Sequence, residues 1–187
     1  MKKKYIVIIM INFIRMFFLK KIKKSFFYNK IIQLISLGTT FDIQENGKIV
    51  LEGRIHTETN TVISAKNGII KLGNNIYLNR NSMIICREEI IIGDGCTIGP
   101  NVCIYDHDHD ITHPGKLKTK KISIGKNVWI GAGCIILKGV EIGDDSIIAA
   151  GTIVVKSVSA NTIIRNKIEN IITEKKNEKN YCNSNSK

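Results

Sequence analysis

The chain has 187 residues, a formal net charge of +12 and only two prolines. This length suits one domain with a buried core and appended segments. The positive charge lies at the ends, because residues 1–30 carry nine Lys or Arg and no acid, whereas residues 31–164 carry 13 basic and 13 acidic residues. The central body is therefore neutral, and we expect no nucleic-acid partner.

The N-terminal segment, residues 1–38, is predicted to be helical, basic and apolar. Residues 5–19 are mostly apolar and are flanked by lysines on both sides. A helix of this length would span about 22 Å, which is less than the roughly 30 Å of a bilayer core. Two interpretations remain open. Residues 1–30 lie as an uncleaved helix at the cytoplasmic face of a membrane, or the helix packs on the main domain or on a neighbouring subunit.

The central segment, residues 39–160, is predicted to be a β-solenoid. Apolar residues recur every six positions, a period that belongs to neither an α-helix nor a single strand. Gly, Asn and Asp stand between them at positions suited to tight corners. Short repeats of this kind indicate coils that bury their apolar faces against one another. The most regular series is Ile124, Ile130, Ile136, Ile142, Ile148 and Val154.

One polar segment interrupts the repeat, and we expect it to be a protruding loop over residues 105–122. Twenty positions separate Ile104 from Ile124, and the sequence between them contains three histidines and three aspartates. Segments that leave a regular scaffold often carry function. Beyond residue 160 the pattern fades, so residues 161–187 are predicted to form a C-terminal segment with a disordered polar tail.

The loop supplies the candidate chemistry. Histidine is the natural general base near neutral pH, and His107, His109 and His113 fall within seven residues. Asp106 is one of the aspartates that could orient an imidazole ring. A zinc site is the competing interpretation of clustered histidines, but no metal is expected. The five cysteines form no C-x-x-C pair, which favours a reducing, cytoplasmic location.

The hexads, the polar loop with a histidine five residues after Ile104, and residues 127–132 (NVWIGA) together resemble the left-handed β-helix acyltransferases. Within them, the resemblance is to maltose- and galactoside-O-acetyltransferase-like enzymes, including those that acetylate bacterial surface polysaccharides. It covers about residues 70–160. The fold implied is an all-β, left-handed parallel β-helix. The left hand comes from the resemblance alone, because parallel crossovers are normally right-handed.

The resemblance also implies residue roles. His109 matches the base that deprotonates the acceptor hydroxyl, with His113 as the alternative if the loop slides by four residues. Asn79 matches a residue on the acceptor side, where His107 is also expected to lie. The acetyl-CoA site would include Trp129, Gly131, Ala132, Ala150 and Lys156, with the Ala132 backbone N–H suited to stabilising an oxyanion.

The function implied is acetyl-CoA-dependent O-acetyl transfer to a sugar hydroxyl. The acceptor would belong to a bacterial capsule, lipopolysaccharide or exopolysaccharide, or to a precursor of one. The resemblance also implies a homotrimer, and we expect a cytoplasmic protein that lies peripherally at the inner face of the plasma membrane. The alternatives are a small-molecule acetyltransferase acting on serine, a nucleotide sugar or an antibiotic, and a zinc-dependent γ-carbonic-anhydrase-like protein. In place of the acid that follows the acceptor asparagine in sugar acetyltransferases stands Cys86 or Arg87, so acceptor recognition should differ.

Overall fold

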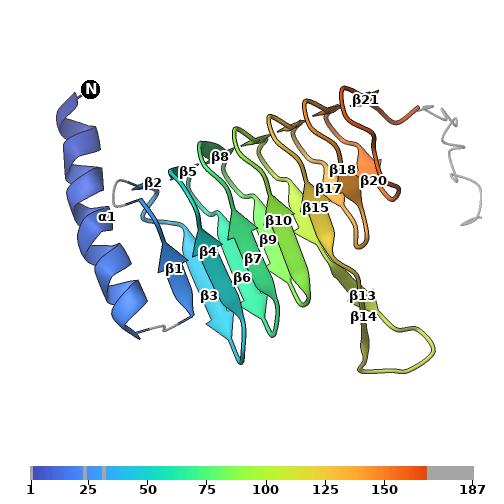
Figure 1. Cartoon of the computed structure of the whole chain (residues 1–187), viewed down its shortest axis with the longest axis horizontal. Coiled ribbons are helices and arrows are strands. Elements are labelled where there is room, and N and C mark those ends of the chain that lie inside the picture. The colour runs from blue at the N-terminus through green and yellow to red at the C-terminus, as the bar shows by residue number, and fades with distance from the viewer. Residues whose placement is uncertain (1, 23–24, 31–32, 168–187) are drawn as a thin grey trace, which may run out of the picture.

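The computed structural model describes residues 2–22, 25–30 and 33–167. Their β-strands form three parallel sheets that stack as the faces of a triangular prism, with an α-helix across one end and a hairpin protruding from one edge (Figure 1). The sheets have six, seven and six strands, so the chain makes six complete coils and begins a seventh. The predicted left-handed parallel β-helix with an N-terminal helix and a protruding loop is confirmed.

Each coil contributes one strand to each sheet, in the order sheet A, sheet B, sheet C. Sheet A contains β1 (Phe26–Tyr28), β4 (Lys48–Leu51), β7 (Ile69–Leu72), β10 (Glu89–Ile92), β15 (Ile122–Ile124) and β18 (Glu141–Ile142). Sheet B contains β2 (Leu34–Ile35), β5 (Ile55–Thr57), β8 (Ile76–Leu78), β11 (Thr97–Ile98), β16 (Trp129–Ile130), β19 (Ile147–Ile148) and β21 (Ile163–Ile164). Sheet C contains β3 (Thr40–Gln44), β6 (Val62–Lys66), β9 (Met83–Cys86), β12 (Cys103–Tyr105), β17 (Ile135–Ile136) and β20 (Ile153–Val154).

The hexad residues form the core. Ile98 pairs in register with Leu78 above and Ile130 below, and all three are fully buried. Each coil therefore buries its apolar side chains against the same positions of its neighbours, which is why the repeat must stay in register.

The corners depend on residues that accept positive φ. At the corner between sheets B and C (the BC corner), Asn60, Asn81 and Asn101 have φ between 57° and 59°. Their amides stack, because Asn60 donates to Asn81 and Asn81 donates to Asn101 over 3.3 and 3.1 Å. Asparagine tolerates this backbone conformation better than other non-glycine residues. The ladder ties three successive coils together along one edge.

The helix α1 (Lys2–Ile22) packs against the first coil. That coil begins with β1 at Phe26, within the segment expected to precede the solenoid. It lacks hexads and is filled instead by Phe26 and Phe41, whose rings meet edge to face with centroids 5.0 Å apart. Met16 of the helix, only 1% exposed, closes this end of the core.

The C-terminal side of the solenoid also differs from the expected boundaries. β21 extends the coils to Ile164, beyond the expected end at residue 160. The predicted disordered tail falls mostly on residues 168–187, which lie outside the described residues. No helix within the described ranges combines the length and apolar character needed to cross a bilayer.

Candidate functional site

The polar segment that breaks the repeat is a two-stranded hairpin at the corner between sheets C and A (the CA corner). β13 (His107–His109) pairs antiparallel with β14 (Leu117–Thr119), and His109 lies opposite Leu117. The hairpin leaves the body after β12 and returns at β15, so it separates coil four from coil five (Figure 1). The loop predicted over residues 105–122 is thus an ordered arm that presents its histidines outside the prism.

Asp106 anchors the base of this arm. Its side chain is 0% exposed. It accepts hydrogen bonds from the backbone amide of Arg87 at 2.8 and 3.0 Å and from that of Glu88 at 2.7 Å. The Cys86 thiol donates to it over 3.1 Å, and burial raises the pKa of this thiol well above its usual range. The carboxylate thereby satisfies the backbone donors of the CA corner one coil earlier.

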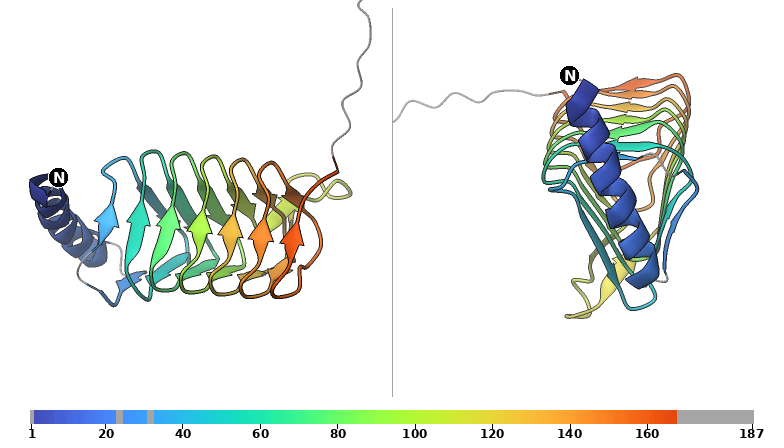
Figure 2. Two further views of the ribbon diagram at one scale, coloured as in Figure 1. Left: turned by 90° about the horizontal axis from the view of Figure 1, so that it is seen from above. Right: turned by 90° about the vertical axis from the view of Figure 1, so that its left-hand side faces the viewer.

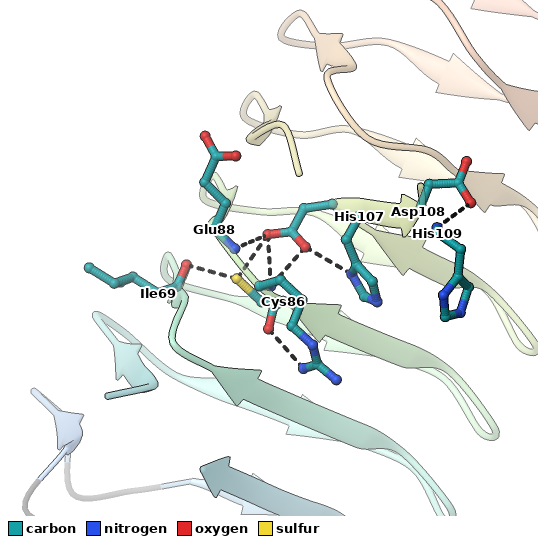
Figure 3. A network of polar contacts seen from close by, with 8 residues as sticks. Ile69, Cys86, Glu88, His107, Asp108 and His109 are labelled. Atoms are coloured by element: carbon teal, nitrogen blue, oxygen red, sulfur yellow. Dashed lines mark hydrogen bonds and ion pairs between the residues drawn. The ribbon is translucent and has the colours of Figure 1, made fainter. Parts of the chain in front are cut away.

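The same carboxylate holds His107. Asp106 Oδ1 lies 3.1 Å from His107 Nδ1, and the His107 side chain is only 17% exposed (Figure 3). A carboxylate on Nδ1 favours the tautomer with the proton on that nitrogen and leaves Nε2 as the acceptor. Asp106 and His107 therefore form an oriented pair, the arrangement expected from the alternating sequence.

His109 lies two residues further along the same strand. Side chains two apart in a strand share a face, and in Figure 3 the rings of His107 and His109 point to the same side of the arm. The His109 ring is exposed, and its backbone amide donates to Asp108 over 3.0 Å. His113 is at the hairpin tip, 62% exposed, with Nδ1 3.0 Å from Asp110. The strand thus places His107 and His109 together and His113 apart from them.

Two ion pairs fix the arm to the body and close its tip. Lys138 of the fifth coil contacts Asp108 over 3.1 Å, and its hydrogen bond lowers the pKa of that carboxyl. Lys118 contacts Asp110 over 3.0 Å within the arm. Hydrogen bonds from Thr112 lower the pKa of Asp110 far below its usual range. Surface ion pairs are individually weak, but the first joins the arm to the next coil and the second closes the hairpin.

The remaining predicted residues lie mostly along the BC corner. Asn79 is at this corner in the third coil, and its side chain accepts from the Arg80 amide over 2.8 Å. Two and three coils further along, Gly131, Ala132 and Ala150 occupy the same edge. The Gly151 amide donates to the Ala132 carbonyl over 2.8 Å. A Cβ on Gly131 would lie 2.6 Å from the Ala150 backbone nitrogen, so this edge is backbone packed on backbone.

Trp129 and Lys156 extend the set. Trp129 points outward from sheet B, is 55% exposed, and pairs in register with Thr97 and Ile147. Lys156 follows β20 and is exposed at the CA corner of the sixth coil. Within one chain the width of sheet C separates the histidine arm from Asn79 and the BC corner. The structure therefore brings Asp106, His107 and His109 together, but not these residues with Asn79.

A surface groove elsewhere in the described structure contains none of the predicted residues. It lies over the last coils and is lined by Ser123, Gly125, Glu141, Ile142, Gly143, Asp144, Ser157, Val158 and Ser159. Among the described residues, no group of three His, Cys, Asp or Glu side chains is placed to hold a metal ion. The candidate site is thus an open edge and an arm, with exposed side chains that a second molecule could cover.

Sequence reasoning missed two features of this region. The Asp106 contact with the Arg87 and Glu88 amides depends on the stacking of two successive coils, and no local sequence motif predicts it. The ion pair between Lys138 and Asp108 joins residues 30 apart. Its signal in the sequence is the position of Lys138 at the corner one coil after the arm.

Comparison with known families supports the repeat. The family model described as bacterial transferase hexapeptide (six repeats) matches residues 121–156. A second model, the hexapeptide repeat of succinyl-transferase, matches residues 89–105. Both matches fall on regular coils that flank the arm. The chain is therefore a β-solenoid that contains hexapeptide repeats.

Among known proteins, the chain is similar to a nodulation protein and to several acyltransferases. Nodulation protein L from Rhizobium leguminosarum bv. viciae is 44% identical over 75 residues, which are 38% of this chain and 40% of the relative. The chain spans about two fifths of the length of the curated relatives it matches first. Among solved structures, a galactoside acetyltransferase in complex with coenzyme A has a TM-score of 0.57 and 33% identity, covering 66% of this chain and 60% of that one. A mutant of AntD, an N-acyltransferase from Bacillus cereus, in complex with dTDP and coenzyme A, has a TM-score of 0.64 and 25% identity, covering 78% and 81%.

Proposed function

We propose that this protein is an acetyl-CoA-dependent O-acetyltransferase that acts on a sugar hydroxyl. The observation that carries the proposal is the likeness to a galactoside acetyltransferase bound to coenzyme A, which extends over 66% of this chain at 33% identity. The arm adds the chemistry, because it places an oriented Asp–His pair beside a second, exposed histidine.

In the proposed reaction His109 is the base. A ring nitrogen accepts the proton of the acceptor hydroxyl as its oxygen attacks the thioester carbonyl carbon of acetyl-CoA. The Ala132 N–H stabilises the negative charge that develops on the carbonyl oxygen. The C–S bond then breaks, the acetyl ester is released, and the CoA thiolate takes the proton from His109. General base catalysis of this kind contributes about 10²–10⁴-fold to the rate.

Asp106 and His107 are proposed to prepare this site. The buried carboxylate fixes the base of the arm and the His107 ring, and His107 in turn borders the face on which His109 stands. Asn79 is proposed to contact the acceptor. Trp129, Gly131, Ala132, Ala150 and Lys156 are proposed to line the path of coenzyme A along the solenoid.

These residues can act together only if another chain contributes. The arm lies at the CA corner and Asn79, Gly131, Ala132 and Ala150 lie at the BC corner of the same prism. A homotrimer with parallel solenoids would set the CA corner of one chain against the BC corner of the next. We propose this assembly, in which the exposed Trp129 is also covered.

The acceptor is proposed to be a capsule, lipopolysaccharide or exopolysaccharide sugar or its precursor, reached at the inner face of the plasma membrane. A second candidate is a sugar carried on a nucleotide, because AntD, which covers most of this chain, was solved with dTDP and coenzyme A. The two candidates share the donor site and the base. They differ in whether the acceptor carries a nucleotide.

The test is thiol release from acetyl-CoA by the purified full chain, with free sugars, glycan fragments and nucleotide sugars as acceptors. The expected result is acceptor-dependent release that falls by about 10²-fold or more in His109→Ala. Release that survives His109→Ala and is lost in His113→Ala would move the base to the hairpin tip. Release only with nucleotide sugars would select the second candidate. Failure to bind coenzyme A in calorimetry would reject the proposed function.

A further inference from the structure

The N-terminal helix α1 presents buried polar side chains together with Met16 to the solenoid, and large apolar side chains to its surroundings. The side toward the solenoid carries Asn12, which is fully buried, and the half-buried Arg15. The opposite side carries eight large apolar side chains that are between 38% and 63% exposed. They are Ile6, Val7, Met10, Ile11, Phe13, Ile14, Phe17 and Phe18, and we call them the outer face.

The side of α1 toward the solenoid, its inner face, is hydrogen-bonded to the first coil. Asn12 donates to the Ile35 and Gln33 carbonyls over 2.8 and 3.3 Å. Arg15 donates to the carbonyls of Ser36 and Thr39. These oxygens belong to the first coil, which has no preceding coil to pair with. The helix therefore caps an open edge of the β-helix with polar side chains.

The outer face has no such partner within the described residues. Positions 6, 10, 13 and 17 follow the i, i+3, i+4 spacing that forms one stripe along a helix, and 7, 14 and 18 widen it. A contiguous apolar patch of this kind on a protein surface marks an interaction site. The right-hand view of Figure 2 shows α1 lying across the end of the solenoid, so this stripe faces away from the body.

The charge around the stripe decides what covers it. Apart from Arg15, which faces the solenoid, residues 1–30 carry eight lysines and no Asp or Glu, and Lys21 is exposed at the end of the helix. A second copy docked through this face would bring two such sets of positive charge together without any acid to offset them. A bilayer with anionic head groups offers acyl chains to the stripe and negative charge to the lysines.

We propose that the outer face of α1 docks on an anionic lipid bilayer. The helix then lies in the interface with its phenylalanines among the acyl chains, and Asn12 and Arg15 hold the solenoid above it. The two faces of α1 thus serve two different surfaces. This inference does not depend on the proposed reaction, because docking requires neither acetyl-CoA nor an acceptor.

The experiment is co-sedimentation of the full chain with vesicles of phosphatidylcholine alone and with about one third phosphatidylglycerol. We expect binding to the mixed vesicles that is about tenfold or more stronger than to phosphatidylcholine and that weakens as salt is raised. The double variant Phe13→Glu/Phe17→Glu should bind about tenfold or more weakly, because both side chains lie on the outer face and both new charges oppose the lipid. Ile163→Glu is the matched control, since Ile163 is 69% exposed on sheet B far from the helix.

Thermal unfolding of all three proteins shows whether a variant has simply unfolded. The variant Phe17→Trp, compared with the native chain and its single Trp129, gives an independent readout. Its fluorescence should shift to the blue when mixed vesicles are added. Equal recovery of the native chain in the pellet with and without vesicles would overturn the proposal. The proposal would also be overturned if the native chain self-associates in lipid-free solution and the double variant does not. The outer face would then bind a second copy of the chain.

Discussion

The buried carboxylate of Asp106 lies 3.1 Å from His107 Nδ1 and at the same time caps the amides of Arg87 and Glu88. One side chain therefore joins the base of the histidine arm to the corner of the coil before it. The position of the arm is set by the stacking of coils, and the orientation of His107 follows from the same contact.

Asp106→Asn should lower both stability and activity. An amide that replaces the carboxylate presents an N–H to at least one backbone donor, which leaves a buried donor unsatisfied. We expect a loss of about 1–3 kcal/mol in the free energy of unfolding, measured by urea denaturation. Asp108→Asn is the control, because Asp108 is exposed and contacts Lys138 and the backbone of its own neighbour. Equal losses in the two variants would show that Asp106 is not the anchor.

The three histidines of the arm should separate in activity. His109→Ala should reduce kcat by about 10²–10⁴-fold through loss of the proposed base. His107→Gln should have a smaller effect on kcat and should alter its pH profile. The reason is that His107 is proposed to orient the site around His109 and not to accept the proton of the acceptor hydroxyl. His113→Ala should leave kcat within a few fold. Single-turnover acetyl transfer checks this order, and a reversal between His107 and His109 would assign the base to the oriented pair.

The asparagine ladder should accept one more member. Gly133 continues the BC corner below Asn101 with φ of +68°, and a Cβ added there would meet nothing within 4 Å. Gly133→Asn should therefore change the free energy of unfolding by less than about 1 kcal/mol, because the strain of a side chain at this φ is small for asparagine and is offset by a more restricted unfolded chain. Gly131→Ala is the contrast: its Cβ would meet the Ala150 nitrogen at 2.6 Å. Overpacking there should cost about 1–3 kcal/mol. Melting temperatures of the two variants and the native chain test this prediction, and equal losses in both variants would contradict it.

The pKa of Asp110 should depend on Thr112. Hydrogen bonds from Thr112, Lys118 and His113 favour the carboxylate and lower its pKa. A lowered pKa in the folded arm contributes stability above the unfolded value of about 3.9, and that contribution disappears as pH falls through the folded value. Thr112→Val should raise the pKa of Asp110, measured by carboxyl NMR titration, whereas Thr112→Ser should leave it low. An unchanged titration in Thr112→Val would show that Lys118 and His113 suffice.

The regular coils could be predicted from sequence because the six-residue spacing of apolar residues directly reflects how the coils pack on one another. Ile124, Ile130 and Ile136 stand six apart since each fills the same inward position on successive faces. The first coil could not be predicted in this way. Phe26 and Phe41 close an end of the prism, where α1 replaces a neighbouring coil and the spacing no longer matters.

The arm was predicted as a departure from the repeat, but not as a hairpin. Its pairing of His109 with Leu117 and its anchor at Asp106 depend on contacts between coils that are distant in sequence. The separation of Asn79 from the histidines could not be predicted from the sequence either. Only the three-sided stacking shows that they occupy different corners.

The number of coils between α1 and the arm sets the distance between the helix and the histidines. Adjacent parallel strands are about 4.8 Å apart, so three steps from the first coil to the fourth raise the arm by about 14 Å, and the helix adds about 10 Å. On a bilayer, the histidines would stand at a set height of about 25 Å from the lipid side of α1. Acceptor hydroxyls held near that height would be reached, and those pressed against the head groups would not. Adding or removing one coil would change the height of the arm above the bilayer without altering a single residue of the proposed site.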